Sequence, residues 1–322
     1  MANSEIDTGK VTFVEVTADN DGQRLDNFLL SVLKKVPKTL VYRIIRKGEV
    51  RVNKGRAKAD ARIHEGDVVR IPPLRLAPEQ AAAQASDDLL GLLARSIVYE
   101  DDALIAINKP HGLAVHGGSG VSLGLIEALR QMYPDHSFLE LVHRLDRDTS
   151  GIILVARKRT ALVGLQRMLV NKSGIRKRYL AMLHGRWPAS INEVKAPLKK
   201  FERQSGERIM LVDEDGKPSH TRFRLLSAGS HYSLVEAEPV TGRTHQIRVH
   251  SQFQGYAIAG DDKYRDKTQT LIDQAHGVRR LCLHALQLEF PHPITGKAMC
   301  LRAEPGEELA QLIQQEGCSY EL

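Results

Sequence analysis

Apolar residues recur along this chain with two different spacings, and each spacing predicts one type of secondary structure. A recurrence at every third or fourth position is typical of helices with one buried face. Helices are predicted at residues 24–33, 40–46, 123–133, 160–170 and 307–315. Runs rich in β-branched residues predict strands, at residues 11–16, 50–53, 68–71, 152–156, 176–185, 232–238, 281–285 and 288–293. Residues 97–110 predict two more strands, which are joined by an acidic turn.

The 322 residues are enough for about two domains. Residues 1–21 predict a polar tail and a strand, and residues 22–73 a small first domain. Residues 74–96 contain a proline, an alanine run and several acidic residues, which indicate a semi-flexible linker. Residues 97–322 follow as a larger second domain.

Composition narrows the class of protein and of partner. An apolar content of 42% and a charged content of 26% fit a soluble globular protein. The net charge of +7 suits a polyanion such as nucleic acid, while 5% aromatic residues argue against a surface that stacks many unpaired bases. The three cysteines are far apart, and the chain shows neither a signal peptide nor a membrane-length apolar run. We therefore expect a cytoplasmic protein with reduced thiols and no membrane partner.

Basic residues are concentrated in the first domain. Between residues 34 and 62 only Glu49 and Asp60 are acidic, whereas eleven residues are basic: Lys34, Lys35, Lys38, Arg43, Arg46, Lys47, Arg51, Lys54, Arg56, Lys58 and Arg62. Such a run is often only a solvated face, but charges of one sign repel each other unless a partner neutralises them. The patterns Arg-Leu-Asp-x-Phe-Leu (24–29), Arg-x-Ile-x-x-Gly-x-Val-x-Val-Asn (43–53) and Glu-Gly-Asp-Val-Val (65–69) resemble the S4 RNA-binding domain. The resemblance implies that RNA is bound here, with these candidates: Arg43, Arg46, Lys47, Arg51, Lys54 and Arg56.

A polar loop, His-Arg-Leu-Asp-Arg-Asp-Thr-Ser-Gly at residues 143–151, leads directly into the strand predicted at residues 152–156. A buried strand fixes the backbone of such a loop, so the loop can carry chemistry. Asp146 lies between Arg144 and Arg147, and we expect its carboxylate to be ionised at pH 7. An ionised carboxylate can act as a nucleophile or a base. The alternative is a turn in which Asp146 or Asp148 only accepts backbone hydrogen bonds.

This loop resembles the signature of the RluA-type pseudouridine synthases, His-Arg-Leu-Asp-x-x-Thr-Ser-Gly. Five more elements are similar to motifs of that family: Asn-Lys-Pro-x-Gly-x-x-Val-His (108–116), Lys-x-Tyr-x-Ala (177–181), Thr-Gly-Arg-x-His-Gln-Ile-Arg-x-His (241–250), Gly-Asp-x-x-Tyr (260–264) and Leu-x-Leu-His-Ala (281–285). The resemblance extends over residues 22–315. It implies an α+β fold, in which a large, mostly antiparallel mixed sheet carries a cleft and a small S4-like α/β domain precedes it.

The same resemblance implies an isomerase that converts uridine to pseudouridine in RNA, within the branch that acts on 23S (large-subunit) ribosomal RNA. Asp146 takes the catalytic position, Tyr179 packs at the uracil and is the favoured base for the last proton, and Arg248 pairs with Asp146. The sequence leaves open whether Asp146 attacks C1′, attacks C6 or removes the C2′ proton. It also leaves open which uridines are modified.

The target uridine lies in folded RNA and must be flipped into the pocket. We expect Arg144 to fill the vacated stack or to hold a phosphate. Further candidates for RNA contacts are His143, Asn108, Lys109, His116, Arg243 and His245. Thr244 is expected to cap a helix that turns Ile247 inward.

No cofactor is expected, because the reaction is a net isomerisation, and no metal site is expected. His245 and His250 are five residues apart, as are His111 and His116, which is not the four-residue spacing of a zinc pair on a helix. The protein is expected to be a monomer that has ribosomal RNA as its partner.

Two other functions compete with this interpretation. Asp146-Arg147-Asp148-Thr149 resembles the Asp-x-Asp motif of Mg²⁺-dependent haloacid-dehalogenase phosphatases, but there the pair follows the buried strand, whereas here the strand follows the pair. The second rival is a non-enzymatic RNA-binding assembly factor with a degenerate second domain. The intact set of Asp146, Tyr179 and Arg248 favours an enzyme.

Overall fold

The computed structural model describes residues 9–33, 36–74, 83–118, 123–136, 138–204 and 206–320. The chain divides into two compact units between residues 82 and 83, and each is described by itself. Part of the predicted tail (1–8), part of the predicted linker (75–82) and two residues of the basic run, Lys34 and Lys35, lie outside the described residues.

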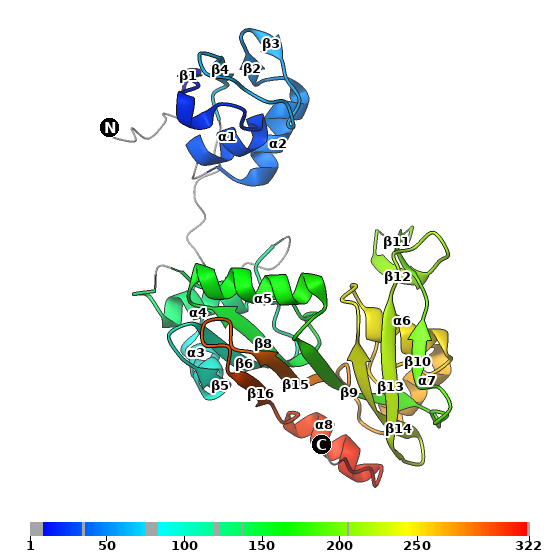
Figure 1. The fold of residues 1–322 in the computed structure, drawn as a ribbon. Coiled ribbons are helices and arrows are strands. Elements are labelled where there is room, and N and C mark those ends of the chain that lie inside the picture. Colours follow the sequence, from blue (N-terminus) through cyan, green and yellow to red (C-terminus); the bar gives the residue numbers. More distant parts are fainter. Residues whose placement is uncertain are drawn as a thin grey trace. The chain divides into compact units, whose positions relative to one another are not determined.

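The first unit is a four-stranded antiparallel sheet with two helices (Figure 1, blue). In chain order its elements are β1 (Thr12–Glu15), a 3-10 turn η1 (Ala18–Asn20), α1 (Leu25–Val32), α2 (Lys38–Lys47), β2 (Arg51–Val52), β3 (Gly55–Arg56) and β4 (Val68–Ile71). Leu25, Phe28 and Leu29 lie on one face of α1 at helical spacing and are buried in this unit's core. Helix α2 ends at Gly48, whose φ of 68° is the left-handed conformation that favours glycine.

Strand β1 belongs to this sheet, although the sequence assigns it to a segment that precedes the first domain. It pairs with β4 from Thr12↔Ile71 to Glu15↔Val68. The sheet order β1-β4-β2-β3 therefore places the first strand of the chain at one edge.

The second unit is built on a ten-stranded sheet whose main path runs β10-β13-β14-β9-β15-β8-β6-β5. Its strands are β5 (Ile97–Glu100), β6 (Leu104–Lys109), β7 (Glu140–Leu141), β8 (Ser150–Ala156), β9 (Arg176–His184), β10 (Glu193–Lys195), β13 (His220–Ala228), β14 (Tyr232–Pro239), β15 (Leu283–Pro291) and β16 (Ala298–Arg302). Among the described strand pairs only β8–β15 is parallel. This confirms the predicted mixed, mostly antiparallel sheet. Strands β11 (Leu198–Glu202) and β12 (Arg208–Val212) form a separate hairpin.

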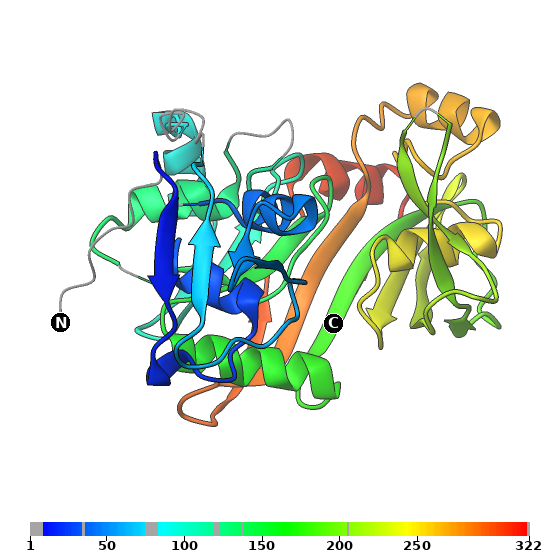
Figure 2. The ribbon, with the colours of Figure 1, turned by 90° about the horizontal axis from the view of Figure 1, so that it is seen from above.

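Helices cover both faces of this sheet, namely α3 (Asp87–Arg95), α4 (Leu125–Met132), α5 (Arg159–Asn171), α6 (Gln246–Phe253), α7 (Lys267–Ala275) and α8 (Glu307–Gln315). Side chains of a strand point alternately to its two faces. In β8, Ile152 and Leu154 pack in the core that contains α5, while Ile153 and Val155 pack in the core that contains α3 and α4. Figures 1 and 2 show α5 on one side of the sheet and α4 on the other. Strand β8 is therefore buried on both faces, which explains its continuous apolar run.

Residues 83–96 of the predicted linker are not a tether, and Leu74 at its start is buried in the core of the first unit. Residues 83–96 contain α3, whose first turn is capped by the Ser86 hydroxyl, which accepts a hydrogen bond from Leu89 N. Leu93 is fully buried in the core of the second unit. Helix α3 is thus part of the second unit and extends it towards the N-terminus. None of the helices in the described ranges has the length and apolar character that a membrane crossing requires.

Candidate active site

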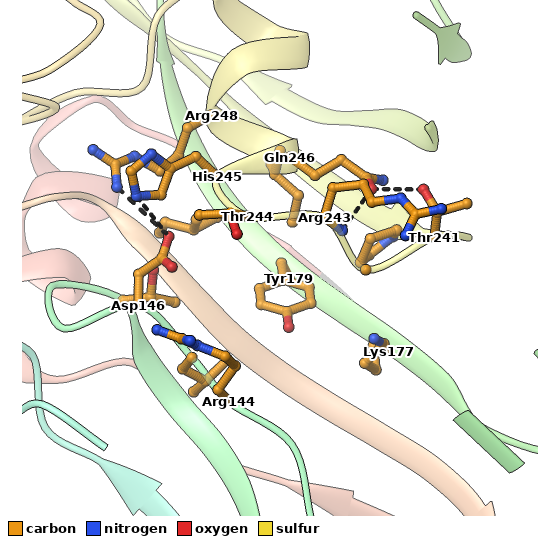
Figure 3. Close-up of a pocket in the computed structure, with 16 residues that line it drawn as sticks. Arg144, Asp146, Lys177, Tyr179, Thr241, Arg243, Thr244, His245, Gln246 and Arg248 are labelled. Atoms are coloured by element: carbon orange, nitrogen blue, oxygen red, sulfur yellow. Dashed lines mark hydrogen bonds and ion pairs between the residues drawn. The ribbon is translucent and has the colours of Figure 1, made fainter. Parts of the chain in front are cut away.

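A pocket of about 140 Å³ opens where the middle strands of the large sheet meet helix α6. Four segments line it: the loop before β8, strand β9, the segment from the end of β14 into α6, and strand β15. Its lining residues are Arg144, Leu145, Asp146, Thr149, Lys177, Tyr179, Pro239, Thr241, Gly242, Arg243, Thr244, His245, Gln246, Ile247, Arg248 and Leu283. Figure 3 shows Asp146 and Arg248 pointing towards each other beside the ring of Tyr179. Four family motifs that are far apart in sequence therefore converge on one pocket.

Lys109 holds the loop that carries Asp146. Its ammonium donates to the carbonyl oxygens of Pro110, Leu113 and Arg147 at 2.8, 2.9 and 2.9 Å. The side chain is fully buried, and this burial lowers the pKa of Lys109 to about 7. The prediction that Lys109 contacts RNA is therefore wrong, because its ammonium is enclosed by backbone carbonyls.

The last two residues of the signature loop, Ser150 and Gly151, hold β8 close to β15 and do not line the pocket. Gly151 has φ 109°, and a Cβ at this position would lie 2.3 Å from the carbonyl oxygen of Ala285 on β15. Next to it, the Ser150 hydroxyl donates to His284 Nδ1 at 2.9 Å and accepts from Arg280 Nη2 at 2.7 Å. A glycine is therefore needed for the close approach of β8 to β15.

The pairing of Asp146 with Arg248 is present, as predicted. Arg248 Nη1 lies 3.5 Å from Asp146 Oδ2, and Arg248 Nε and Nη2 each donate to a carboxylate oxygen of Asp261 at 2.7 Å. Burial alone lowers the pKa of Arg248, but its hydrogen bonds to Asp261 and the charges of Asp261 and Asp146 raise it above the ordinary value. Asp261 and Arg248 are buried, whereas the Asp146 side chain is 25% exposed. The guanidinium is thus fixed by one carboxylate and presented to another that a substrate can reach.

His245 lies beside Arg248 and approaches the same carboxylate oxygen, with Nε2 3.8 Å from Asp146 Oδ2 (Figure 3). Its Nδ1 is 2.7 Å from the Tyr264 hydroxyl, whose oxygen accepts the Met210 N–H at 3.0 Å. The tautomer with its hydrogen on Nε2 fits these contacts, because Tyr264 O–H then donates to Nδ1 and Nε2–H faces Asp146. Burial lowers the pKa of His245, which favours the neutral ring.

Helix α6 begins one residue later than the predicted cap implies. His245, with a left-handed φ of 53°, is the residue before the helix, and Thr244 is exposed at the pocket. Ile247 is buried, as expected. The Gln246 side chain secures this turn, since its Oε1 accepts from Thr241 Oγ1 at 2.6 Å and from Arg243 N at 3.1 Å. The predicted cap at Thr244 was wrong because backbone strain at His245, not a hydroxyl, shapes the start of the helix.

Tyr179 and Lys177 lie two residues apart on β9 and line the same wall of the pocket (Figure 3). Burial, with a contribution from the charge of Asp146, raises the pKa of the Tyr179 phenol well above its ordinary value. Burial lowers the pKa of the Lys177 ammonium. Lys177 was not among the predicted site residues, although the Lys-x-Tyr element contains it and period-two alternation places it on the face of Tyr179.

The remaining RNA-binding candidates of the second unit separate into two groups. Arg144 and Arg243 line the pocket and are exposed, as is the edge of His245. His143 does not line it: the Nε2 atom accepts from Leu154 N at 3.3 Å, and burial lowers its pKa to about 3, so the ring is neutral.

Asn108 and His116 also lie outside the pocket. The Asn108 amide donates to the carbonyl of Glu304 at 3.0 Å, and His116 Nδ1 is 3.1 Å from the carbonyl of Gly117. The predictions for His143 and Asn108 as RNA ligands are not supported by these contacts, whereas His116 is an exposed side chain beside the motif loop.

In the first unit, five of the six candidates are exposed and Arg51 is half-buried. They lie on α2 and on the β2–β3 hairpin that follows it, at positions Arg43, Arg46, Lys47, Arg51, Lys54 and Arg56. Arg56 Nη2 donates to the Lys47 carbonyl at 3.1 Å, so the hairpin is tied to the end of the helix.

Comparison with protein families gives two matches. The RNA pseudouridylate synthase family model matches residues 103–253, and the S4 domain model matches residues 23–69. Among solved structures, human RNA pseudouridylate synthase domain containing 4 superimposes with a TM-score of 0.59 at 25% identity, covering 71% of this chain and 96% of that one. Human RNA pseudouridylate synthase domain containing 1 gives a TM-score of 0.57, also at 25% identity, over 70% of this chain and 96% of its own.

Sequence relatives cover nearly the whole chain. Ribosomal large subunit pseudouridine synthase C of Escherichia coli K12 is 51% identical over 312 residues, which are 96% of this chain and 98% of that protein. The Yersinia pestis protein of the same name is 52% identical over 306 residues, covering 94% and 95%. The Haemophilus ducreyi protein is 49% identical over 314 residues, covering 97% and 98%. Together with the motifs gathered in the pocket, these matches show that the chain belongs to the RNA pseudouridylate synthase family of isomerases and carries an S4 domain before its synthase domain.

Proposed function

We propose that this protein isomerises uridines of 23S (large-subunit) ribosomal RNA to pseudouridine and that Asp146 is the reacting carboxylate. Relatives about half identical to this chain over nearly its whole length are ribosomal large subunit pseudouridine synthases. The observation that carries the role of Asp146 is its position in the pocket, partly exposed and 3.5 Å from a guanidinium that Asp261 fixes.

The reaction breaks the bond between uracil N1 and ribose C1′, turns the base, joins C5 to C1′ and moves the C5 proton to N1 through the solvent. Asp146 contributes in one of three ways: it attacks C1′, attacks C6 or removes the C2′ proton. Each of these steps requires an ionised carboxylate within contact distance of the flipped nucleoside. Arg248 and His245 lie 3.5 and 3.8 Å from the same carboxylate oxygen, so a guanidinium and an imidazole face Asp146.

Tyr179 supplies an apolar wall for the uracil in this proposal. Its ring lies in the pocket, and burial raises its pKa, so the phenol keeps its proton at neutral pH. Acceptance of the C5 proton by Tyr179 requires the phenolate, which this environment disfavours. We therefore assign packing on the base as its main role.

Basic side chains at the pocket compensate the free-energy cost of flipping the uridine out of the RNA, which is on the order of a few kcal/mol. Arg144 is exposed beside Asp146, and Arg243 and Lys177 line the opposite part of the pocket. Figure 3 shows the guanidinium of Arg144 next to Asp146, at the end of the pocket away from Lys177 and Arg243. We propose that Arg144 fills the vacated stack or holds a phosphate next to the flipped nucleotide.

The proposed setting is the cytoplasm, with the protein acting as a monomer on ribosomal RNA. The three cysteines are free thiols, two of them buried, as suits a reducing compartment. Light scattering of the purified protein alone and with an RNA fragment tests the monomer.

Asp146→Asn tests the function. The variant keeps the shape of the side chain and removes its charge, so we expect the rate of pseudouridine formation to fall at least ~1,000-fold. The assay measures the tritium released from C5 of labelled 23S transcript, with the RNA in molar excess over the protein. The matched control is Asp148→Asn in the same loop, since Asp148 pairs with Arg147 and does not line the pocket.

A wild-type rate for Asp146→Asn would overturn the role of Asp146. Stoichiometric binding of transcript by the wild-type protein without any tritium release would overturn the enzymatic function and favour an RNA-binding assembly factor. Phosphate release that requires Mg²⁺ would instead favour the phosphatase alternative.

A further inference from the structure

Three potential metal ligands from distant parts of the chain converge at a place that is separate from the pocket. His231 lies in the turn between β13 and β14, His276 follows the last residue of α7, and Glu316 follows the last residue of α8. One ligand atom from each lies within 4.8 Å of the other two. None of the three lines the pocket. Figure 1 shows α7, α8 and the β13–β14 hairpin in the same part of the second unit.

The carboxylate of Glu316 is buried, and among the residues that the structure describes only one of its oxygens accepts hydrogen bonds. Its side chain is 4% exposed. The Oε2 atom accepts from His231 N at 2.8 Å and from Tyr232 N at 3.3 Å, which fixes the orientation of the group. The Oε1 atom lies 3.6 Å from His231 Nδ1 and 3.9 Å from His276 Nε2, which are longer than hydrogen bonds. A buried negative charge thus points at two imidazole nitrogens without a close partner, an arrangement that costs free energy unless a cation compensates it.

The tautomer of His276 is set by the backbone. Its Nδ1 lies 2.9 Å from the carbonyl oxygen of Ile272, and since a carbonyl only accepts, Nδ1 carries a hydrogen. In the neutral ring, Nε2 then has a lone pair that faces Glu316. A histidine whose other nitrogen donates to a backbone carbonyl is the usual form of a metal ligand. The ring is held further by Tyr232, edge-on at 5.6 Å, and by His231 at 4.3 Å.

We propose that His231, His276 and Glu316 form a binding site for a divalent transition metal, for which Zn²⁺ is the best-suited ion. Two imidazoles and one carboxylate are an established ligand set for Zn²⁺. Bonds of about 2.0–2.2 Å place tetrahedral ligand atoms roughly 3.3–3.5 Å apart. The two distances from Glu316, 3.6 and 3.9 Å, need only modest shortening, and the two imidazole nitrogens, which lie within 4.8 Å of each other, must approach as the ion binds. The His231 side chain is 49% exposed, which gives the ion a path from solvent and leaves room for water as a fourth ligand.

A metal ion at this site connects three segments, namely the β13–β14 turn, the end of α7 and the end of α8. The β13–β14 turn belongs to the large sheet, while α8 contributes Leu309, Leu312 and Ile313 to the core of the second unit. Binding to the folded state alone stabilises a protein by mass action. The ion therefore acts as a structural clamp on α8, and the site requires no contact with the reacting nucleotide.

The test uses the full-length protein after treatment with EDTA and dialysis. Isothermal titration with ZnCl₂ is expected to show one site per chain, and saturating ZnCl₂ is expected to raise the melting temperature by about 2 °C or more. Titration with CoCl₂ is expected to give the visible absorption bands of four-coordinate Co²⁺. This spectrum needs no variant, so the outcome does not depend on whether a substitution disturbs folding.

Two variants locate the site. His231→Ala removes an exposed ligand, and Glu316→Gln keeps an oxygen for the N–H groups of His231 and Tyr232 while it removes the charge. Each is expected to weaken Zn²⁺ binding at least ~10-fold, whereas His116→Ala, at an exposed histidine elsewhere in the unit, is expected to bind like the wild type.

The proposal is overturned if the wild-type protein shows no binding at micromolar Zn²⁺, or if both variants bind as tightly as the wild type. It is also overturned if the metal-free protein becomes more stable on acidification through the titration range of histidine while Zn²⁺ adds nothing. In that case a proton, not a metal, compensates Glu316.

Discussion

The surroundings of the Asp146 carboxylate are formed by side chains that lie about a hundred positions further along the chain. Arg248 reaches it with one nitrogen, because the other two side-chain nitrogens are used by Asp261. Two charge-assisted hydrogen bonds of 2.7 Å leave the guanidinium little freedom. The geometry at Asp146 is therefore set by a buried pair, and Asp261 is a positioning residue in this arrangement.

Tyr179→Phe separates the two roles considered for the aromatic residue. Since burial keeps the phenol protonated, we expect the Phe variant to stay within ~10-fold of the wild-type rate, while Tyr179→Ala loses at least ~100-fold because the wall against the uracil is gone. Single-turnover rates on a 23S fragment measure both variants. A loss for Phe as large as that for Ala would show instead that the hydroxyl takes the C5 proton.

The residue types of the motifs were readable in the sequence, but the direction of each side chain was not. Asp146, Arg248 and Tyr179 reach the pocket, as the motifs implied. Lys109 is equally prominent in its motif, yet its ammonium turns inwards to three carbonyls. A lysine ammonium can bind either an RNA phosphate or backbone carbonyls. One of the carbonyls that Lys109 binds belongs to Arg147, which is distant in sequence and comes close only in the folded chain.

At the scale of secondary-structure elements, the approach of β8 to β15 fixes where the signature loop ends. Gly151→Ala places a Cβ 2.3 Å from a backbone oxygen and requires a φ of 109° from an L residue. We expect the free energy of unfolding to fall by about 2 kcal/mol or more, as measured by urea denaturation. The activity per folded molecule is expected to fall as well, because the loop of Asp146 shifts with the strand.

Gly277→Ala is the matched control for this prediction. Gly277 also has a positive φ, 68°, but a Cβ there meets no atom within 4 Å, so the substitution costs only backbone strain. We expect about 1 kcal/mol for this variant. Equal losses for the two glycines would show that the close approach to Ala285 is not important.

Elements with a strong apolar period were predictable, and elements without one were missed. Helices α1, α4 and α5 lie where the spacing of apolar residues places them. Helix α7 was missed because its nine residues include few apolar ones, and its best signal is the capping box that Asp266 and Gln269 form. Helix α3 was mistaken for linker because an alanine-rich polar stretch precedes it, although Ser86 before two acidic residues is a start signal.

At the scale of the whole molecule, the first unit is expected to supply RNA affinity and the second unit the chemistry. Replacing Arg43, Arg46 and Lys47 by Gln removes three exposed positive charges from α2. We expect KM for 23S RNA to rise ~10-fold or more with kcat nearly unchanged, and the slope of log K against log salt to fall by about 0.7–0.9 for each phosphate that is no longer neutralised. Filter binding over a salt series measures the slope.

A triple variant at Lys158, Lys172 and Lys297 controls for the loss of net charge. These lysines are exposed on the second unit, outside the pocket. Should both triple variants lower the affinity equally, general electrostatic attraction would account for binding, and the S4 domain would have no special part in it.

Two domains followed from the length of the chain and from the basic run in its first part, whereas the mixed sheet was implied only by the resemblance to the synthase family. The bounds of the two domains did not follow from the sequence. Strand β1 belongs to the first unit because it pairs with β4, and helix α3 belongs to the second unit because it packs in the core around Leu93. Such pairings between distant residues leave no local signal.

The parallel pairing of β8 with β15 has a consequence for biosynthesis. Ser150 and Gly151 are in register with His284 and Ala285, so the strand behind Asp146, which pairs on its other side with β6, gains its neighbour β15 only after more than four-fifths of the polypeptide has been translated. Pairings of such long sequence separation form late in folding. A nascent or truncated polypeptide that stops before β15 can carry a complete S4 domain and bind RNA while its synthase domain is inert, so that competence to modify is gained only as synthesis nears its end.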